Sequence, residues 1–287
     1  MTQQIDATAI KQQQREQWGR AAAGWKKHDE RFRGVTAPIT KRLLELTGVA
    51  PGQRVLDVAC GTGEPAIPAA QMVGPAGFVL ATDMAPEMID VAREKASAEG
   101  VSNIEFRLVD GEQLDVPPES FDAVTCRWGM MFMPEPLSFL HQAHGALKPG
   151  GRIALSVWGP PERNPFISLP MSVLRKHYDG PPLPDPTGPG GIFSFADERK
   201  LEFVFQQAAF QAIRIDPLEL PMAVFDNGKL YLQYMMDIAG PLASLLNQLP
   251  AKARKAAENE VIKAAPQGNS DGRVSLNGYT LLASATK

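Results

Sequence analysis

The sequence has little cysteine, no long apolar run and no excess of positive charge. Two cysteines among 287 residues, Cys60 and Cys126, are too few for a disulfide framework and lack metal-ligand spacing, so no metal site is expected. No uncharged apolar segment approaches the ~18 residues of a membrane span, and the first six residues lack the apolar core of a secretory signal. A net charge of −3 disfavours nucleic-acid or anionic-membrane partners held by bulk charge. These absences predict a soluble, cytoplasmic protein without a membrane span.

The composition that remains is globular, with 44% hydrophobic and 21% charged residues, which excludes disordered and fibrous classes. Five short apolar segments alternate with helix-like segments between residues 54 and 158. The expected strands are 54–59, 78–82, 104–108, 121–126 and 153–158, and the expected helices between them include 66–73 and 136–147. This alternation predicts an α/β fold with a doubly wound, mostly parallel sheet and helices on both faces.

The N-terminal segment predicts a helical flap over residues 1–35. Residues 8–33 place Trp18, Ala22, Trp25 and Phe32 on one helix face. The other face is expected to be solvated and carries Lys11, Arg15, Lys26, Lys27 and Arg31. A second short helix is expected from Pro38 to Leu46, with Thr36 as its N-cap.

The pattern changes after Trp158, because nine of the 25 prolines lie between residues 159 and 191. Such a density cannot continue a sheet and predicts an insertion. A helix is expected at 197–209, a strand at 212–215, a helical stretch at 227–265 and a last strand at 278–284. The chain is therefore interpreted as one domain, 36–287, with insertions at about 159–195 and 221–272 that form a lid or substrate region.

Three carboxylates lie at the carboxyl ends of three successive predicted strands: Asp57, Asp83 and Asp110. That edge of an open parallel sheet is where ligands bind. The turn Gly61-Thr62-Gly63 lets the backbone approach a ligand, and Asp83 lies 20 residues beyond Gly63, a spacing suited to binding ribose hydroxyls. The edge therefore predicts a site for a ribose-containing ligand.

The same turn fits the loose dinucleotide pattern Gly-x-Gly-x-x-Gly/Ala across 61–66. Glu64 and Pro65, however, occupy the helix start where a pyrophosphate would need free amides and no negative charge. A ligand with a cationic centre, such as a sulfonium with an ammonium group, suits these carboxylates better.

Several segments, in this order, resemble the motifs of class I S-adenosylmethionine-dependent methyltransferases. The resemblance is strongest to the ubiquinone/menaquinone-biosynthesis type and its small-molecule relatives, and it covers about residues 40–160. The segments are Val55-Leu56-Asp57-Val58-Ala59-Cys60-Gly61-Thr62-Gly63, Asp83-Met84-Ala85-Pro86-Glu87-Met88, Asp110-Gly111-Glu112-Gln113-Leu114, Phe121-Asp122-Ala123-Val124 and Leu147-Lys148-Pro149-Gly150-Gly151. The resemblance implies a Rossmann-like fold with seven strands, S-adenosyl-L-methionine as cofactor and S-adenosyl-L-homocysteine as product.

The resemblance also assigns roles to individual residues. The methionine end would be held, largely through backbone, by Asp57, Ala59, Gly61 and Gly63, and its ammonium by the carbonyl of Arg127. Asp83 would bind the ribose, Met84 would pack on the adenine, Asp110 would take the adenine amino group and Gly111 a ring nitrogen. Ala59 departs from the glycine usual in the family, and alanine fits if its φ stays negative.

The methyl acceptor is expected to be an apolar, possibly aromatic, small molecule methylated at oxygen or carbon. Methyl transfer from a sulfonium mainly requires alignment and a dry pocket. The candidate pocket residues are Trp18, Trp25, Trp128, Met131 and Trp158, in a chain whose methionines gather in post-strand loops and insertions. Packing of the insertions onto the sheet explains these residues equally well.

No catalytic base stands out. His141 and His144 lie on one predicted helix, His144 on its packing stripe, while His28 and His177 lie in the flap and the first insertion. Two alternatives stay open beside the enzyme: a non-catalytic S-adenosylmethionine-binding regulator or scaffold, and a nicotinamide-dependent oxidoreductase. The sequence leaves the oligomeric state open.

Overall fold

One seven-stranded sheet runs through the computed structural model, which describes residues 7–266 and 273–287. The strand order is β3-β2-β1-β4-β5-β7-β6. The strands are β1 (Arg54–Val58), β2 (Phe78–Asp83), β3 (Ile104–Leu108), β4 (Phe121–Arg127), β5 (Leu147–Trp158), β6 (Gln211–Phe225) and β7 (Val274–Thr286). Strands β1 to β5 are mutually parallel, while β7 runs antiparallel to β5 and β6 antiparallel to β7. The predicted doubly wound, mostly parallel sheet is confirmed, and its strand order reverses between β1 and β4.

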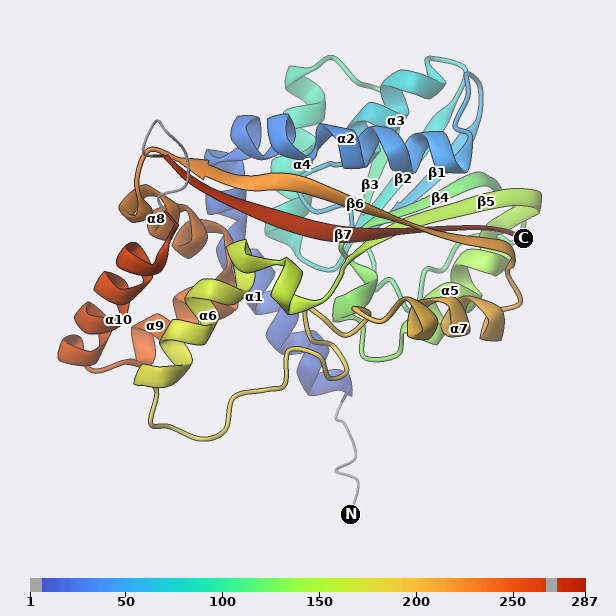
Figure 1. Cartoon of the computed structure of the whole chain (residues 1–287). Helices are drawn as coiled ribbons and strands as arrows, with labels where there is room; N and C mark the ends of the chain where they lie inside the picture. Colours follow the sequence, from blue (N-terminus) through green and yellow to red (C-terminus); the bar gives the residue numbers. More distant parts are fainter. Residues whose placement is uncertain (1–6, 267–272) are drawn as a thin grey trace.

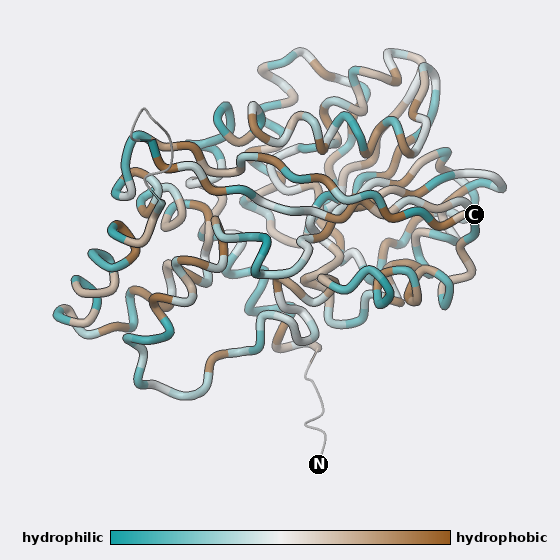
Figure 2. Tube along the Cα trace, in the orientation of Figure 1, coloured by the Kyte–Doolittle hydropathy of each residue, from teal (hydrophilic) through white to brown (hydrophobic). Residues whose placement is uncertain are grey.

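Helices cover both faces of this sheet (Figure 1). On one face lie α2 (Asp29–Thr47), α3 (Ala66–Val73) and α4 (Pro86–Ala98), and on the other α5 (Pro136–Ala146) and α7 (Glu198–Gln207). The strand segments are largely brown in Figure 2, whereas an outer helix such as α7 carries teal turns toward solvent. Central strands such as β1 are buried on both sides, as their short apolar runs require.

A second group of helices gathers beyond the ends of β6 and β7, on the left of Figure 1. It comprises α6 (Pro165–His177), α8 (Gly228–Ile238), α9 (Gly240–Gln248) and α10 (Ala251–Ala264), and the short turns η1 (Met130–Phe132) and η2 (Pro161–Arg163) complete the elements. The proline-rich segment thus contains a helix, which has Pro165 in its first turn and Pro170 inside it. Strand β6 runs to Phe225, past residue 221 where the second insertion is predicted to begin, and residues 267–272 lie outside the described part. The proposed division into flap, domain and insertions stays a prediction.

The N-terminal segment differs from the expectation of one helix at 8–33 and another from Pro38. Helix α1 (Ala7–Lys27) ends before His28, and α2 continues through residues 35 and 36 without a break. Thr36 is therefore no N-cap: its hydroxyl donates to the carbonyl of Phe32 inside α2. Pro38 is accommodated within the helix.

Helix α1 packs at very short range against two elements that are distant in sequence. A Cβ atom at Gly19 would lie 2.6 Å from Oε2 of Glu87 on α4, and one at Gly24 would lie 1.8 Å from the carbonyl oxygen of Asp237 on α8. Glycine is required at position 24 because backbone, unlike a flexible side chain, cannot give way. Helix α1 is thus fixed between the sheet domain and the α6/α8–α10 group.

Candidate functional site

The carboxyl ends of the parallel strands bring the predicted acidic residues to one edge of the sheet. Asp57 lies in β1, Asp83 ends β2, and Asp110 follows β3. Several residues at or just after these strand ends are partly accessible: Ala59, Gly61, Met84, Asp110, Gly111, Arg127 and Gly129. Because the strand order reverses between β1 and β4, this edge is the expected ligand site of such a fold.

Asp83 is organised by backbone amides. Its Oδ2 accepts a hydrogen bond from the amide of Gly61 (2.8 Å) and its Oδ1 one from the amide of Ala85 (2.9 Å). Burial raises the pKa of Asp83, and these amide donors oppose the rise. Gly61 has φ +53° and a Cβ there would meet no atom within 4 Å, so the turn opens onto free space. This space lies beside the carboxylate that is expected to bind ribose hydroxyls.

Asp57 is fully buried and only partly satisfied. Its Oδ1 accepts from the Thr125 hydroxyl at 2.7 Å, whereas its Oδ2 has no hydrogen-bond partner among the residues the structure describes. Burial raises its pKa to about 7, against the opposing effects of the Thr125 hydrogen bond and the Arg127 charge. The backbone amide of Ala66 also opposes this rise of the Asp57 pKa, and the Oδ2 atom remains a buried acceptor without a hydrogen bond, a cost that an N–H group of a cationic ligand in contact with it would relieve.

Ala59 contradicts the expectation of a negative φ. Its φ is +57°, the left-handed region that disfavours any residue with a Cβ. The neighbouring Gly129 compensates for the side chain, since a Cβ at that position would lie 2.5 Å from the Cβ of Ala59. Alanine is thus accommodated by a glycine on the adjacent strand-end loop, at the cost of backbone strain.

Asp110 is held by a residue of the N-terminal helix. Nζ of Lys11 lies 2.7 Å from Oδ2 of Asp110 and also contacts Oε2 of Glu112, while the amide of Glu112 donates to Oδ1 of Asp110. The carboxylate expected to bind an adenine amino group is therefore paired with α1 in this structure. A Cβ at Gly111 would lie 2.9 Å from Cγ1 of Val58, a stiff side chain of β1, and 2.7 Å from the movable Cε of Met133.

The predicted solvated face of α1 and early α2 is exposed at Arg15, Lys26, Lys27 and Arg31, whereas Lys11 is partly buried. Lys11 contacts Asp110, Lys26 contacts Glu94, and Lys27 lies 2.7 Å from Oδ2 of Asp237. Arg31 donates to the carbonyl of Val224 and stacks over the ring of Phe225. These basic side chains contact residues of other elements, and the helical periodicity of the sequence does not predict such partners.

The tryptophans join one aromatic run, which we define as Trp18, Trp25, Phe32, Trp128, Trp158 and Phe166. Successive ring centroids are 6.3, 4.6, 5.9, 4.3 and 5.1 Å apart. Trp128 and Trp158 stack on each other, and Nε1 of Trp128 donates to the Thr280 hydroxyl. Met131 is buried beside this region in η1. The structure therefore brings the candidate acceptor residues together from α1, η1 and the ends of β4 and β5, and it buries Trp128, Met131 and Trp158 in the core, as the packing interpretation also expects.

The histidines are engaged in structural contacts. Nε2 of His28 lies 2.8 Å from Oδ2 of Asp237, and Nε2 of His177 lies 2.9 Å from Oε2 of Glu260. His144 packs edge-on against Phe210, and burial lowers its pKa. A catalytic base is thus still not assigned.

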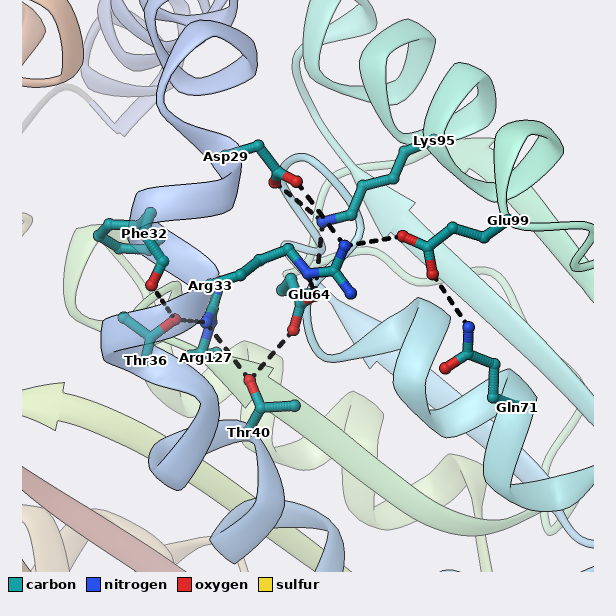
Figure 3. Close-up of polar contacts among 10 residues, drawn as sticks. All are labelled: Asp29, Phe32, Arg33, Thr36, Thr40, Glu64, Gln71, Lys95, Glu99 and Arg127. Atoms are coloured by element: carbon teal, nitrogen blue, oxygen red, sulfur yellow. Dashed lines mark hydrogen bonds and ion pairs between the residues drawn. The ribbon is translucent and has the colours of Figure 1, made fainter.

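A buried polar network links α2 to the glycine turn, and sequence reasoning missed it (Figure 3). Glu64, which follows Gly63, accepts a hydrogen bond from the Thr40 hydroxyl and forms ion pairs with Arg33 and Lys95 at 3.2 and 3.4 Å. Arg127 donates to the hydroxyls of Thr36 and Thr40, as described below. The one-turn spacing of the two threonines is the only signal of this network in the sequence.

Neither a membrane helix nor a metal cluster is found in the described ranges. No described helix is long and apolar enough to cross a membrane. Across residues 7–266 and 273–287, no group of three or more His, Cys, Asp or Glu side chains is arranged to hold a metal ion.

Comparisons with known proteins find similarity to methyltransferases, and the matching family model covers strands β1 to β4 and the start of β5. A family model described as a methyltransferase domain matches residues 55–151. The chain is 36% identical over 147 residues to aklanonic acid methyltransferase of Streptomyces sp. (strain C5), an alignment that covers 48% of this chain and 66% of that protein. It is 37% identical over 126 residues to the ubiquinone/menaquinone biosynthesis C-methyltransferase of Ectopseudomonas mendocina, covering 44% and 49% respectively. The chain thus spans less than two thirds of either relative.

The fold recurs among solved structures. The YcgJ protein of Bacillus subtilis superposes with a TM-score of 0.56 at 19% identity, covering 86% of this chain and 97% of that one. At this identity the likeness concerns the fold alone.

Proposed function

We propose that the chain is a class I S-adenosylmethionine-dependent methyltransferase, as the match of residues 55–151 to a methyltransferase domain supports, and that it methylates an apolar or aromatic small molecule at oxygen or carbon. The observation that carries the proposal is the shared edge of the sheet. The carboxylates of Asp57, Asp83 and Asp110 at the ends of β1, β2 and β3 lie at the same edge of the sheet as the stacked tryptophans at the ends of β4 and β5. One relative is named for aklanonic acid and the other for ubiquinone/menaquinone biosynthesis, and both names concern small-molecule acceptors.

Each strand end has a separate task in this proposal. S-adenosylmethionine supplies the electrophilic methyl group on its sulfonium. Asp83 accepts hydrogen bonds from the ribose hydroxyls, Met84 packs on the adenine, and the Asp110–Gly111 segment binds its edge. Asp57, Ala59, Gly61 and Gly63 hold the methionine end. Since the structure pairs Asp110 with Lys11, adenine binding requires Lys11 to share or leave that carboxylate.

The acceptor is oriented by the aromatic run and by Met131. Their rings and the methionine sulfur provide apolar contact area for a flat molecule and exclude water from the transfer step. The residues contribute alignment rather than proton transfer, which agrees with the structural engagement of the histidines.

Methyl transfer from labelled S-adenosylmethionine into a cell extract, followed by partition between organic solvent and water, tests the proposal. Label is expected in the organic phase. The variant Asp83→Ala should bind S-adenosylhomocysteine at least tenfold more weakly, because the ribose hydroxyls lose a charged acceptor. Asp90→Ala, which removes an exposed carboxylate on α4, is the matched control and should bind normally.

The possible results separate the parts of the proposal. Label confined to water-soluble small molecules would contradict the apolar acceptor while keeping the methyltransferase. Unchanged affinity in Asp83→Ala would remove the cofactor assignment. Cofactor binding without any transfer would favour the regulator or scaffold.

A further inference from the structure

Arg127 is the last residue of β4, beside the point where the strand order reverses. The register pairs Asp57 of β1 with Thr125 of β4, and their side chains are hydrogen-bonded. Because side chains alternate along a strand, Arg127 lies on the same sheet face as Thr125 and Asp57. Arg127 is partly accessible, whereas the β4 residues 123–126 before it are buried. Its guanidinium therefore belongs to the ligand edge of the sheet.

The positive charge of Arg127 has no direct anionic partner. Its Nη1 donates to the hydroxyls of Thr36 (2.8 Å) and Thr40 (3.4 Å), and its plane faces the rings of Phe32 and Trp128. Across the described ranges, no carboxylate oxygen lies within 4.0 Å of its nitrogens. Burial lowers the pKa of Arg127, and the carboxylates of Glu64, Asp57 and Asp29 oppose this only at longer range, so an anion in direct contact would relieve part of the cost of its burial.

Asp57, on the neighbouring strand β1, is a carboxyl group that likewise lacks an ion pair in the described part of the chain. Its fully buried Oδ2 has no hydrogen-bond donor among the described residues. The switch point thus presents a guanidinium and a carboxyl group whose charges act on each other without a direct ion pair between them. An α-amino-acid group carries an ammonium and a carboxylate and would complete both.

We propose that the Arg127 side chain binds the carboxylate of the cofactor's amino-acid end while Asp57 faces its ammonium. This inference rests on the proposed function and deepens it, because it assigns the Arg127 guanidinium to one group of the cofactor, the carboxylate. Guanidinium–carboxylate pairing is charge-assisted and directional, so it would fix the donor's methionine end relative to the methyl group.

Thr36 and Thr40 are positioning residues for this contact. The Thr40 hydroxyl accepts from Arg127 and donates to Oε2 of Glu64 at 3.2 Å, so it joins the loop after β4 to the glycine turn after β1 (Figure 3). Glu64 is fixed in turn by Arg33 and Lys95. Helix α2 thereby sets the distance between the two strand-end loops that flank the switch point.

Calorimetry with two ligands tests the assignment without turnover. S-adenosylhomocysteine and decarboxylated S-adenosylhomocysteine differ only in the carboxylate. The wild-type protein should prefer the former by about 10-fold or more, as expected for a charge-assisted hydrogen bond. Arg127→Gln should bind both ligands with similar affinity, because the carboxylate has lost its partner. Asp57→Asn should weaken both ligands, since both retain the ammonium.

The positioning role has its own variants. Thr40→Val should reduce the preference for the carboxylate several-fold, and Thr40→Ser should restore it because the hydroxyl returns. Thr47→Val is the matched control: Thr47 is also buried on α2, but its hydroxyl donates only to carbonyls of its own helix. It should lower stability without changing the preference.

Three results would overturn the inference while leaving the proposed function intact. They are a wild-type protein that binds the two ligands equally, an Arg127→Gln variant that keeps the preference, and equal effects of Thr40→Val and Thr47→Val. If Arg127→Gln fails to fold, the carboxylate preferences of Thr40→Val, Thr40→Ser and Thr47→Val test the inference in its place. A wild-type protein that binds neither ligand would instead refute the proposed function, and the inference with it.

Discussion

The sheet half at residues 55–151 and the cover formed by α1, α2, α6 and α8–α10 organise their polar groups differently. In the sheet half, amides two residues further along the chain donate to the strand-end carboxylates, as Ala85 does to Asp83 and Glu112 does to Asp110. In the cover, side chains pair over long sequence distances, as Lys11 does with Asp110 and Lys27 with Asp237. Contacts of the first kind are encoded in a few consecutive residues, whereas contacts of the second kind depend on the whole fold.

This difference explains where the relatives agree with the chain. The family model matches the part whose ligand contacts are local, and the alignments span less than half of the chain. A turn that presents amides can be retained while the helices around it are replaced. We therefore expect common cofactor recognition in the sheet half and acceptor recognition specific to this chain in the cover.

The largest expected effect concerns the buried charge of the sheet half. Asp57 has a pKa of about 7 when folded, against an ordinary value of 3.8, because burial disfavours its charge. Between these two pH values the folded protein holds a proton that the unfolded chain has lost. The contribution of Asp57 to the free energy of unfolding therefore falls as pH rises from about 4 to about 7, by roughly 4 kcal/mol, and is constant above that.

Urea unfolding of the wild-type protein and of Asp57→Asn across this range measures that contribution. The wild-type free energy of unfolding should fall relative to the variant as pH rises. A difference between the two proteins that does not change with pH would mean that Asp57 stays ionised in the folded state.

The second prediction concerns how the cover is attached. Gly24→Ala would place a methyl group 1.8 Å from the Asp237 carbonyl oxygen, so α1 must move away from α8. We expect a loss of about 1–3 kcal/mol in the free energy of unfolding, as for other overpacked contacts. Early exposure of α1 in hydrogen exchange should accompany the loss, because the cover would open before the sheet.

Gly34→Ala is the matched control for this substitution. Gly34 is exposed on α2 and a Cβ there would meet no atom within 4 Å. Because alanine has the higher helix propensity, this variant should gain about 0.5–1 kcal/mol. Two glycine-to-alanine changes in the N-terminal helices are thus expected to differ in sign, and equal effects would contradict the tight α1–α8 contact.

The distinction between local contacts and contacts over long sequence distances also separates what the sequence predicts from what it does not. The strands, the glycine turn and the aligned positions of Asp57, Asp83 and Asp110 follow from apolar runs and turn residues, which are local signals. The Lys11–Asp110 pair and the Thr40–Glu64 contact join residues 99 and 24 positions apart, and no periodicity reports such distances. The continuous helix through Thr36 and Pro38 was missed because tertiary packing overrode two local signals for a helix start.

Backbone conformation is the local property that the sequence misjudges at Ala59. The sequence places Ala59 at the end of a strand, where a negative φ is expected, yet its φ is +57°. The glycine usual at this position in the resembling family is the one signal of this conformation. The close approach of Ala59 to Gly129, in two loops that are 70 positions apart in the sequence, is visible only in the structure.

The smallest expected effect tests whether recognition in the sheet half depends on backbone geometry. Ala59→Gly removes a Cβ from a left-handed residue and should raise the free energy of unfolding by about 1 kcal/mol. Ala209→Gly is the matched control, because Ala209 follows α7 with φ +64° and is far from the ligand edge in sequence. Thermal unfolding should show a similar gain for both variants. If backbone atoms hold the cofactor at position 59, calorimetry of Ala59→Gly with S-adenosylhomocysteine should give a Kd within about threefold of the wild-type value, because the φ that presents those atoms is retained. A larger change would mean that the Ala59 methyl group, and with it side-chain packing against Gly129, takes part in recognition.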